Sequence, residues 1–360
     1  MAENFSLSEL VIPGTYIRVR AEGLISVGGI STGNIGIVGT ADNETGATHL
    51  LSDYDSAKAT FGAYDAYSDG TGIHNLTRGL ELLYQNGART VFAYALDPDD
   101  TPGQDDYIAA FNELAKDDVN ILVAPELDTT TALAVFGSVL ETAENNGKDM
   151  IAVIGSDQTA RDDIKAQVTA NDRIIMTTPG IQAYDAAASA TVTLNGRYSA
   201  AAVAGLISTL APQASPTNKV LPGVVKLAQR FSYGDMKDLV SNRLMVLEER
   251  RGVRVVRGLT TDDGAFTQVT TRRITDFAKA GIRAAADPFI GRLNNERVRK
   301  ALQGAIDGFL TTMIQDEALI AYNLEVTATR QDEIAGRAIV NAVLQPTFSI
   351  DFVAVTLVLQ

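Results

Sequence analysis

Residues 348–360 read Phe348-Ser-Ile-Asp-Phe-Val-Ala-Val-Thr-Leu-Val-Leu-Gln360. In an extended chain the side chains beyond Asp351 are apolar on both faces, with Val353, Val355, Leu357 and Leu359 on one face and Phe352, Ala354 and Val358 on the other. Two apolar faces are typical of a strand that is covered on both sides. Chain ends usually fray, so we expect this stretch to be ordered as a strand inside a sheet, in its own subunit or in the next.

A shorter strand-like stretch lies near the start of the sequence. Thr15-Tyr-Ile-Arg-Val-Arg-Ala21 follows a Pro-Gly turn signal, and in it Ile17 and Val19 alternate with Arg18 and Arg20. This alternation is typical of a strand with one buried face. Two strand-like arms on one chain indicate joints between subunits.

The composition excludes several classes of protein. The chain has 360 residues, 46% of them hydrophobic, with no Cys, two His and a net charge of −14. The lack of Cys excludes disulfides, thiolate metal sites and Cys nucleophiles, and the acidic charge argues against a general nucleic-acid binder. No window of about twenty residues is apolar throughout, and Met1 to Ser6 lack a signal-peptide pattern, so we expect folding in the cytoplasm.

The charges are unevenly distributed along the chain. Acidic residues crowd the stretch from Asp97 to Asp118, and Arg and Lys collect between Arg243 and Lys300. Such a distribution suits head-to-tail contact between copies. It suits two solvated faces equally well.

The pattern of strands and helices divides the chain into two parts. Between residues 34 and 190, strand-like runs alternate with helix-like runs, which predicts a sandwich-like α/β domain with a mostly parallel sheet. Residues 191–360 form the second part, predicted to be α+β. It contains an Ala-rich helix, a Pro-rich connector, a hairpin at 242–257, two helices at 271–286 and 294–314, and strands at 324–329, 338–344 and 348–359. Residues 1–33 are expected to be an N-terminal arm and its lead-in.

No motif in the sequence predicts catalysis. Gly28-Gly-Ile-Ser-Thr-Gly33 precedes the first buried strand, whereas a dinucleotide-binding loop follows one. The Gly-Lys pair at Gly147 and Lys148 is followed by Asp149 instead of the Ser or Thr of a phosphate loop. The runs of Asp are typical of turns and helix starts. We therefore expect no catalytic, cofactor-binding or metal site, and no enzyme.

One basic set has helical spacing. Arg292, Arg299 and Lys300 approach one face of a predicted helix together with Glu296, and Arg297 lies beside them. This face could meet an acidic partner. A solvated face with an internal Glu-to-Lys pair fits the spacing as well.

Several stretches, in their order along the chain, resemble the contractile tail sheath family. The opening Ile12-Pro-Gly-Thr-Tyr-Ile-Arg-Val19 looks like the family's Pro-Gly-Val-Tyr arm, with Thr15 in place of a small apolar residue. Tyr198-Ser-Ala-Ala-Ala-Val-Ala-Gly205 and the connector at 215–223 are similar to its Ala-Gly helix and Pro-Asn-Lys segment. Arg272-Arg-Ile-Thr-Asp-Phe277 with Phe289-Ile-Gly-Arg-Leu-Asn294 resembles its C-terminal helical pair. The family includes the sheaths of phages, phage-tail-like bacteriocins and extracellular contractile injection systems.

The resemblance implies a structural subunit that polymerises around an inner tube and contracts to drive the tube through a target membrane. Terminal β arms would add strands to the sheath domains of neighbouring subunits, with the N-terminal arm formed by Tyr16, Ile17, Arg18 and Val19 and the C-terminal arm by Phe352, Val353, Val355, Leu357 and Leu359. The candidate tube-facing residues are Arg292, Arg297, Arg299 and Lys300.

The resemblance also implies the partners and the location. The partners would be further copies of the chain, the inner tube protein, and baseplate and tail terminator or cap proteins, with neither nucleic acid nor direct membrane insertion, and with no cofactor. Assembly would take place in the bacterial cytoplasm, within a phage virion or a phage-tail-like particle that can be released. The alternative is a cytoplasmic α/β ligand-binding protein or enzyme whose terminal strands complete its own sheet.

Overall fold

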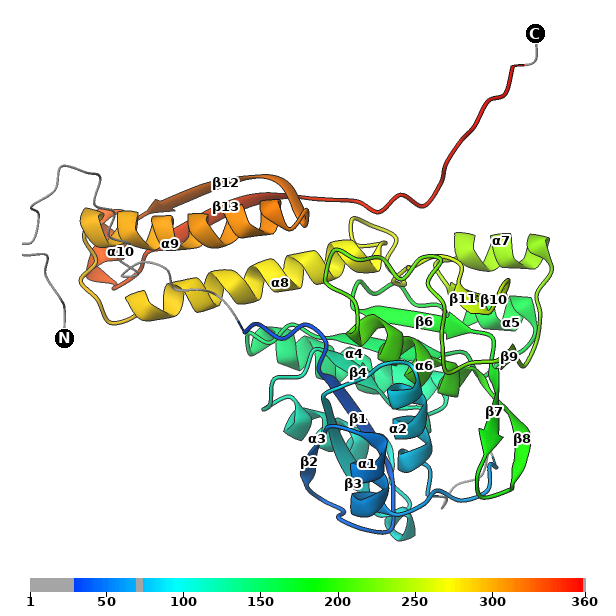
Figure 1. The fold of residues 1–360 in the computed structure, drawn as a ribbon. Helices are drawn as coiled ribbons and strands as arrows, with labels where there is room; N and C mark the ends of the chain where they lie inside the picture. The colour runs from blue at the N-terminus through cyan, green and yellow to red at the C-terminus, as the bar shows by residue number, and fades with distance from the viewer. Residues whose placement is uncertain (1–28, 69–73, 359–360) are drawn as a thin grey trace, which may run out of the picture.

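The computed structural model describes residues 29–68 and 74–358. Figure 1 shows a body built on a large sheet, a narrower unit of helices and two strands beside it, and an extended C-terminal arm that leaves both. Among the described residues, no helix combines the length and the apolar character needed to cross a membrane.

The body is built around an eight-stranded sheet, in the order β11-β10-β6-β5-β4-β1-β3-β2. Its six inner strands run parallel, and β2 and β11 pair antiparallel at its two edges. The strands are β1 (Ile35–Thr40), β2 (Thr48–Leu51), β3 (Val91–Leu96), β4 (Ile121–Val123), β5 (Ile151–Gly155), β6 (Ile174–Thr178), β10 (Met245–Glu249) and β11 (Val253–Val255). The parallel arrangement confirms the predicted α/β fold.

Helices cover both faces of this sheet. Because successive side chains of a strand point to opposite faces, Ile35 and Ile37 of β1 enter one core and Val38 enters the other. The first core includes side chains of α1 (Tyr54–Phe61), α2 (Leu76–Gln85) and α6 (Gly196–Ser208). The second includes those of α3 (Gln104–Leu114), α4 (Thr129–Asn145), α5 (Arg161–Ala166) and α7 (Tyr233–Ser241).

The large sheet continues past residue 190, where the sequence predicts a domain boundary. Residues of α6 pack in its first core, and β10 pairs with β6 through Met245 and Val246. A small sheet lies at the expected boundary, in the order β8-β7-β9, and consists of β7 (Ile181–Asp185), β8 (Ala190–Leu194) and β9 (Lys226–Leu227). The strand pairing thus assigns residues up to Val255 to the body.

The narrower unit has its own core, between a helix pair and a two-stranded antiparallel sheet. Its elements are α8 (Val269–Ala286), α9 (Glu296–Gln315), β12 (Leu319–Thr327), α10 (Arg330–Ile334) and β13 (Ile339–Pro346). Two short 3-10 helices complete the described elements, η2 (Pro98–Asp100) and η3 (Asp287–Phe289). The side chain of Asn295 caps α9 by accepting a hydrogen bond from the backbone N–H of Val298, which explains why the helix begins there.

The strand predicted at 348–359 is not formed within this chain. Residues 349–358 have no secondary structure, and Figure 1 shows them running away from both units. No turn follows Pro346 up to residue 358, so the chain continues outward and does not return to pair with β13. Leu359 and the N-terminal arm residues Tyr16, Ile17, Arg18 and Val19 lie outside the described residues.

Candidate subunit-joining site

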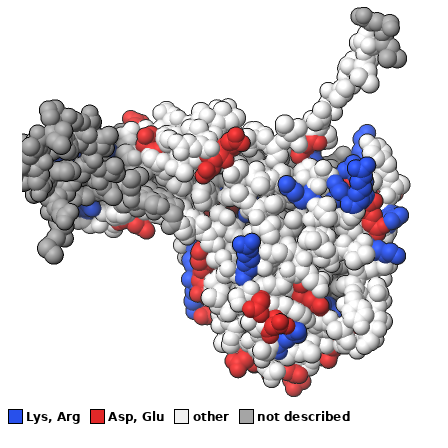
Figure 2. Space-filling model, viewed as in Figure 1, with Lys and Arg blue, Asp and Glu red and all other residues white. Residues whose placement is uncertain are grey.

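The C-terminal arm presents apolar side chains to solvent. Phe352, Val353, Val355 and Leu357 are 78%, 81%, 74% and 84% exposed. No Lys, Arg, Asp or Glu occurs beyond Asp351, and the arm is accordingly white in Figure 2. An exposed run of this length and character is unusual on a monomeric surface and is typical of interaction sites.

The two-stranded sheet provides edges to which such an arm could add. Its inward side chains Tyr322, Leu324, Val340 and Leu344 pack on the helix pair. Within the described residues, β12 and β13 pair only with each other, so each strand keeps one edge of backbone groups outside the ladder. Unpaired edges are templates for a further strand.

An apolar cavity lies beside β13. It has a volume of about 420 Å³ and is lined on one side by Ile274 and Thr275 of α8 and on the other by Ala342 and Leu344 of β13. Phe348, which follows β13, also borders it. A strand added along β13 could place alternate side chains in this cavity.

The arm begins at a segment around Asp351, which we call the arm root, and a polar cluster holds this segment in place. The Asp351 side chain is 6% exposed, and the Nε atom of Arg257 donates to its Oδ2 atom at 2.7 Å. Gln268 and Thr217 also donate to the Asp351 carboxylate. Sequence reasoning missed this cluster, because its partners lie far from Asp351 along the chain.

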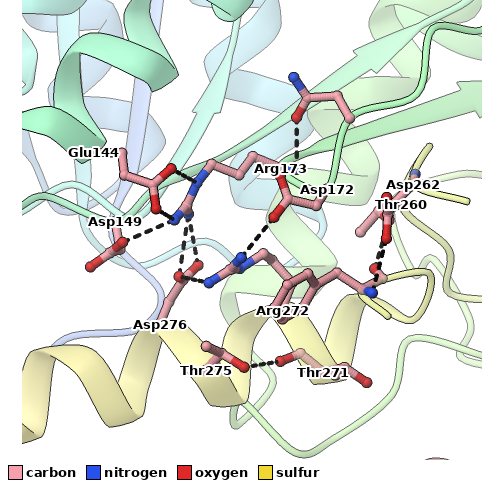
Figure 3. A network of polar contacts seen from close by, with 12 residues as sticks. Glu144, Asp149, Asp172, Arg173, Thr260, Asp262, Thr271, Arg272, Thr275 and Asp276 are labelled. Atoms are coloured by element: carbon pink, nitrogen blue, oxygen red, sulfur yellow. Dashed lines mark hydrogen bonds and ion pairs between the residues drawn. The ribbon is translucent and has the colours of Figure 1, made fainter. Parts of the chain in front are cut away.

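A second polar network joins the body to α8 (Figure 3). Arg173 at the start of β6 is 4% exposed and pairs with Glu144 and Asp149 at 2.9 Å each and with Asp276 of α8 at 3.1 Å. Arg272 pairs with Asp276 as well, at 2.6 Å. The hydrogen bond from Arg173 lowers the pKa of Glu144 to about 2, so its carboxylate stays charged and the network stays intact at neutral pH.

Several of the basic residues between Arg243 and Lys300 pair with acidic residues of the same chain in this network. Arg272 also pairs with Asp172, and Lys279 and Arg283 pair with Asp149. The basic residues that collect over β10, β11 and α7 remain at the surface, as Figure 2 shows. The uneven charge seen in the sequence is therefore partly neutralised within the chain itself.

The basic residues predicted to face a tube have different environments. Arg292 and Arg297 are exposed, and Lys300 forms an exposed pair with Glu296 at 2.7 Å. The side chain of Arg299 is only 14% exposed and pairs with Glu333 at 3.0 Å. It also donates to Asn294. Arg299 therefore ties α9 to α10, and its assignment to the tube-facing set stays a prediction.

The crevice where an α/β sheet would bind a ligand is occupied by the chain itself. In this sheet the crevice lies at the carboxyl ends of β1 and β4, whose outgoing connections lead to opposite sides. Glu126 lies there, and its carboxylate accepts hydrogen bonds from the backbone N–H of Thr40 at 2.9 Å and from the Thr40 hydroxyl at 2.7 Å. Burial raises the pKa of Glu126 to about 7. The geometry of this crevice does not favour the alternative of a ligand-binding protein.

The fold and the site are typical of one class of protein: an assembly subunit with a folded body and an exposed apolar arm. Family comparisons agree with this class. The model of the phage tail sheath protein central domain matches residues 100–261, and the model of the phage tail sheath C-terminal domain matches residues 261–360. The chain belongs to the phage tail sheath protein family, and it is a structural subunit of a contractile sheath.

Solved structures share the whole fold. A chain of the anti-feeding prophage baseplate matches with a TM-score of 0.76 at 20% identity, over 97% of this chain and 99% of that one. The anti-feeding prophage helical sheath in its contracted state matches with a TM-score of 0.74 at 20% identity, over 96% and 99%. The contracted PVC sheath complex of an extracellular contractile injection system matches with a TM-score of 0.74 at 17% identity, over 96% and 97%. A search of curated proteins found no match.

Proposed function

We propose that this chain polymerises around an inner tube, and that contraction of the polymer drives the tube through a target membrane. The observation that carries the proposal is the uncharged, exposed arm that follows β13. In β-augmentation, main-chain hydrogen bonds attach such an arm to the sheet of a neighbouring copy, and pockets that receive alternate side chains add specificity. The free edges of β12 and β13 offer the main-chain groups, and the cavity beside β13 offers a pocket.

The energetics of the arm favour sharing over isolation. Burying the five large apolar side chains Phe352, Val353, Val355, Leu357 and Val358 at about 2 kcal/mol each contributes on the order of 10 kcal/mol. Ordering the backbone of residues 352–358 costs about 1–2 kcal/mol per residue, which is again on the order of 10 kcal/mol. The arm alone gains little. Hydrogen bonds to an acceptor strand then decide whether it becomes ordered.

The joint propagates because it is heterologous. The arm and its acceptor are different surfaces, so each bound copy presents a new arm or a new acceptor, and the contact forms a ring or a helix. The network around Arg173 keeps the body and α8 together, so subunits would rotate and slide as rigid bodies while the arms act as tethers.

Further partners follow from the same proposal. Arg292, Arg297 and Lys300 remain candidates to face the tube, because they are exposed. Baseplate and terminator or cap proteins would meet the two ends of the polymer, without nucleic acid and without membrane insertion. The protein would act without catalysis or cofactor. It would be assembled in the bacterial cytoplasm, within a phage or a phage-tail-like particle.

Deleting Val353 to Gln360 tests the role of the arm. We expect a folded subunit that no longer polymerises, because residues 353–358 belong to none of the three cores. Circular dichroism reports folding, and gel filtration with negative-stain microscopy reports assembly. A full-length control with Val353, Val355 and Leu357 changed to Ser should fail in the same way.

The alternative class of protein predicts different results. A ligand-binding protein that uses its terminal strand in its own sheet would misfold when the strand is deleted. A full-length chain that stays monomeric at high concentration, with both ends intact, would also contradict the sheath proposal.

A further inference from the structure

Asp351 is the last charged residue of the chain, and its side chain is buried although its neighbours are exposed. The Asp351 side chain is 6% exposed, whereas its neighbours Ile350 and Phe352 are 83% and 78% exposed. A buried carboxylate is retained only where donors compensate its lost hydration. The contacts of Asp351 therefore indicate a specific task at this position.

Three donors from separate parts of the chain reach this carboxylate. Arg257, just after β11, donates from Nε to Oδ2 at 2.7 Å. Gln268, the N-cap residue of α8, donates to the same oxygen at 3.1 Å. Thr217, in the Pro-rich connector, donates from its hydroxyl to Oδ1 at 3.2 Å. The cluster thus connects the arm root to both the body and the helical unit.

Contacts on either side of Asp351 hold the same short segment. The backbone N–H of Ser349 donates to Oε1 of Gln268 at 3.1 Å, and the backbone N–H of Thr347 donates to the carbonyl of Ala318 at 3.0 Å. The Phe352 ring lies against the Arg257 guanidinium, with 5.2 Å between the ring centroid and Cζ. Beyond Phe352, residues 353–358 are exposed, have no secondary structure and run away from both units (Figure 1). The contacts with the rest of the chain therefore end at Phe352.

We propose that Asp351 is a positioning residue that anchors the arm root and thereby sets the register in which the arm pairs with a neighbouring copy. This inference rests on the proposed function. Side chains along a strand alternate between faces, so a slip of one residue exchanges the two faces of the whole strand. Both faces of this arm are apolar, and its own side chains therefore distinguish the two registers poorly. When the arm root is fixed in position, only one of the two registers can form.

Disulfide cross-linking in assembled particles tests the register directly, because the chain has no Cys of its own. One Cys replaces Thr356, the only polar side chain between Asp351 and Gln360. The second replaces, one at a time, a side chain on the outer face of the acceptor sheet: Asn323 or Glu325 of β12, or Asn341, Val343 or Gln345 of β13. With Asp351 intact, we expect one position to give most of the cross-link between copies.

Removing the contact between Asp351 and Arg257 should spread the cross-links over more acceptor positions. In Asp351→Ala and Arg257→Ala, we expect the preferred position to lose its preference and neighbouring positions to gain cross-links, while Arg257→Lys retains the original pattern. Glu296→Ala is the matched control, because it removes an exposed ion pair that lies away from the arm root. Should Asp351→Ala not fold, Asp351→Asn keeps the shape of the side chain and removes its charge.

The outcomes separate the anchor from the proposed function. An unchanged single preferred position in both Asp351→Ala and Arg257→Ala overturns the anchor and leaves strand sharing intact. Absence of cross-links between copies at every position, with Asp351 present and particles assembled, overturns strand sharing itself. A purely structural role for Asp351 would lower the melting temperature without redistributing the cross-links.

Discussion

Glu126 illustrates at the residue scale how this fold uses an ionisable group where other α/β proteins bind a ligand. Its carboxylate accepts from Thr40 at the end of β1, and the hydroxyl of Tyr107 on α3 lies 3.4 Å from it. Burial raises its pKa from the ordinary value of 4.5 to about 7. The group therefore favours the folded state when it is protonated. That contribution is fully present below pH 4.5 and is lost as the pH rises through 7.

The variant Glu126→Gln should reveal this pH dependence. Gln keeps an acceptor for Thr40 and has no charge to bury, so the stability of the variant relative to the parent should be higher at pH 8 than at pH 5. The gain is at most about 3 kcal/mol, and less where solvent reaches the carboxylate. Urea unfolding at the two pH values measures it. An equal difference in unfolding free energy at both values would show that Glu126 is not titrating in this range.

The residues that hold the arm root could not be predicted from the sequence. Asp351 and Arg257 are 94 positions apart, and neither belongs to a motif with a fixed spacing. The pairing of Arg299 could not be predicted either: its helical spacing indicated a surface position, but its side chain is only 14% exposed and pairs with Glu333. In both cases the environment of the side chain depends on a partner that is distant in the sequence, and the periodicity of the sequence does not predict such partners.

At the scale of elements, the predictions succeeded where the local pattern was strong. The helices predicted at 271–286 and 294–314 correspond to α8 (Val269–Ala286) and α9 (Glu296–Gln315), so each end was predicted to within two residues. The sequence analysis missed β2, which is only four residues long. The strand expected at 348–359 is not formed in the single chain, where residues 349–358 have no secondary structure. Its pairing with the sheet of a neighbouring copy stays a prediction.

The exposed basic side of α9 carries its own prediction. Arg297→Glu should leave folding unchanged and abolish co-assembly with the tube protein, because Arg297 is exposed and its reversal places an acidic charge on the proposed contact. Arg299→Ala is the comparison: it should destabilise the subunit by about 1 kcal/mol through loss of its partly buried pair with Glu333. Co-sedimentation with tubes measures the first effect and thermal unfolding the second. Normal sheathed tubes from Arg297→Glu would refute the assignment.

At the scale of the whole molecule, rigid and free parts are clearly divided. Two ion pairs join the helical unit to the body: Arg173 pairs with Asp276 of α8, and Arg272 of α8 pairs with Asp172. Both arginine side chains are buried, and removing one partner of a buried pair is strongly destabilising. Residues 353–358, the described part of the arm beyond Phe352, take part in no comparable pair. Under the proposed function, such a subunit would change its orientation within an assembly without changing its own fold, and the arm would keep it connected.

The position of the arm in an assembled particle tests the central claim most directly. A cryo-EM reconstruction of the polymer shows where residues 352–358 of each copy lie. We predict that they form a strand along β12 or β13 of another copy, with Asp351 still bound to Arg257 of its own chain. Arms folded onto their own subunits, or free in solvent within an otherwise complete polymer, would contradict the account.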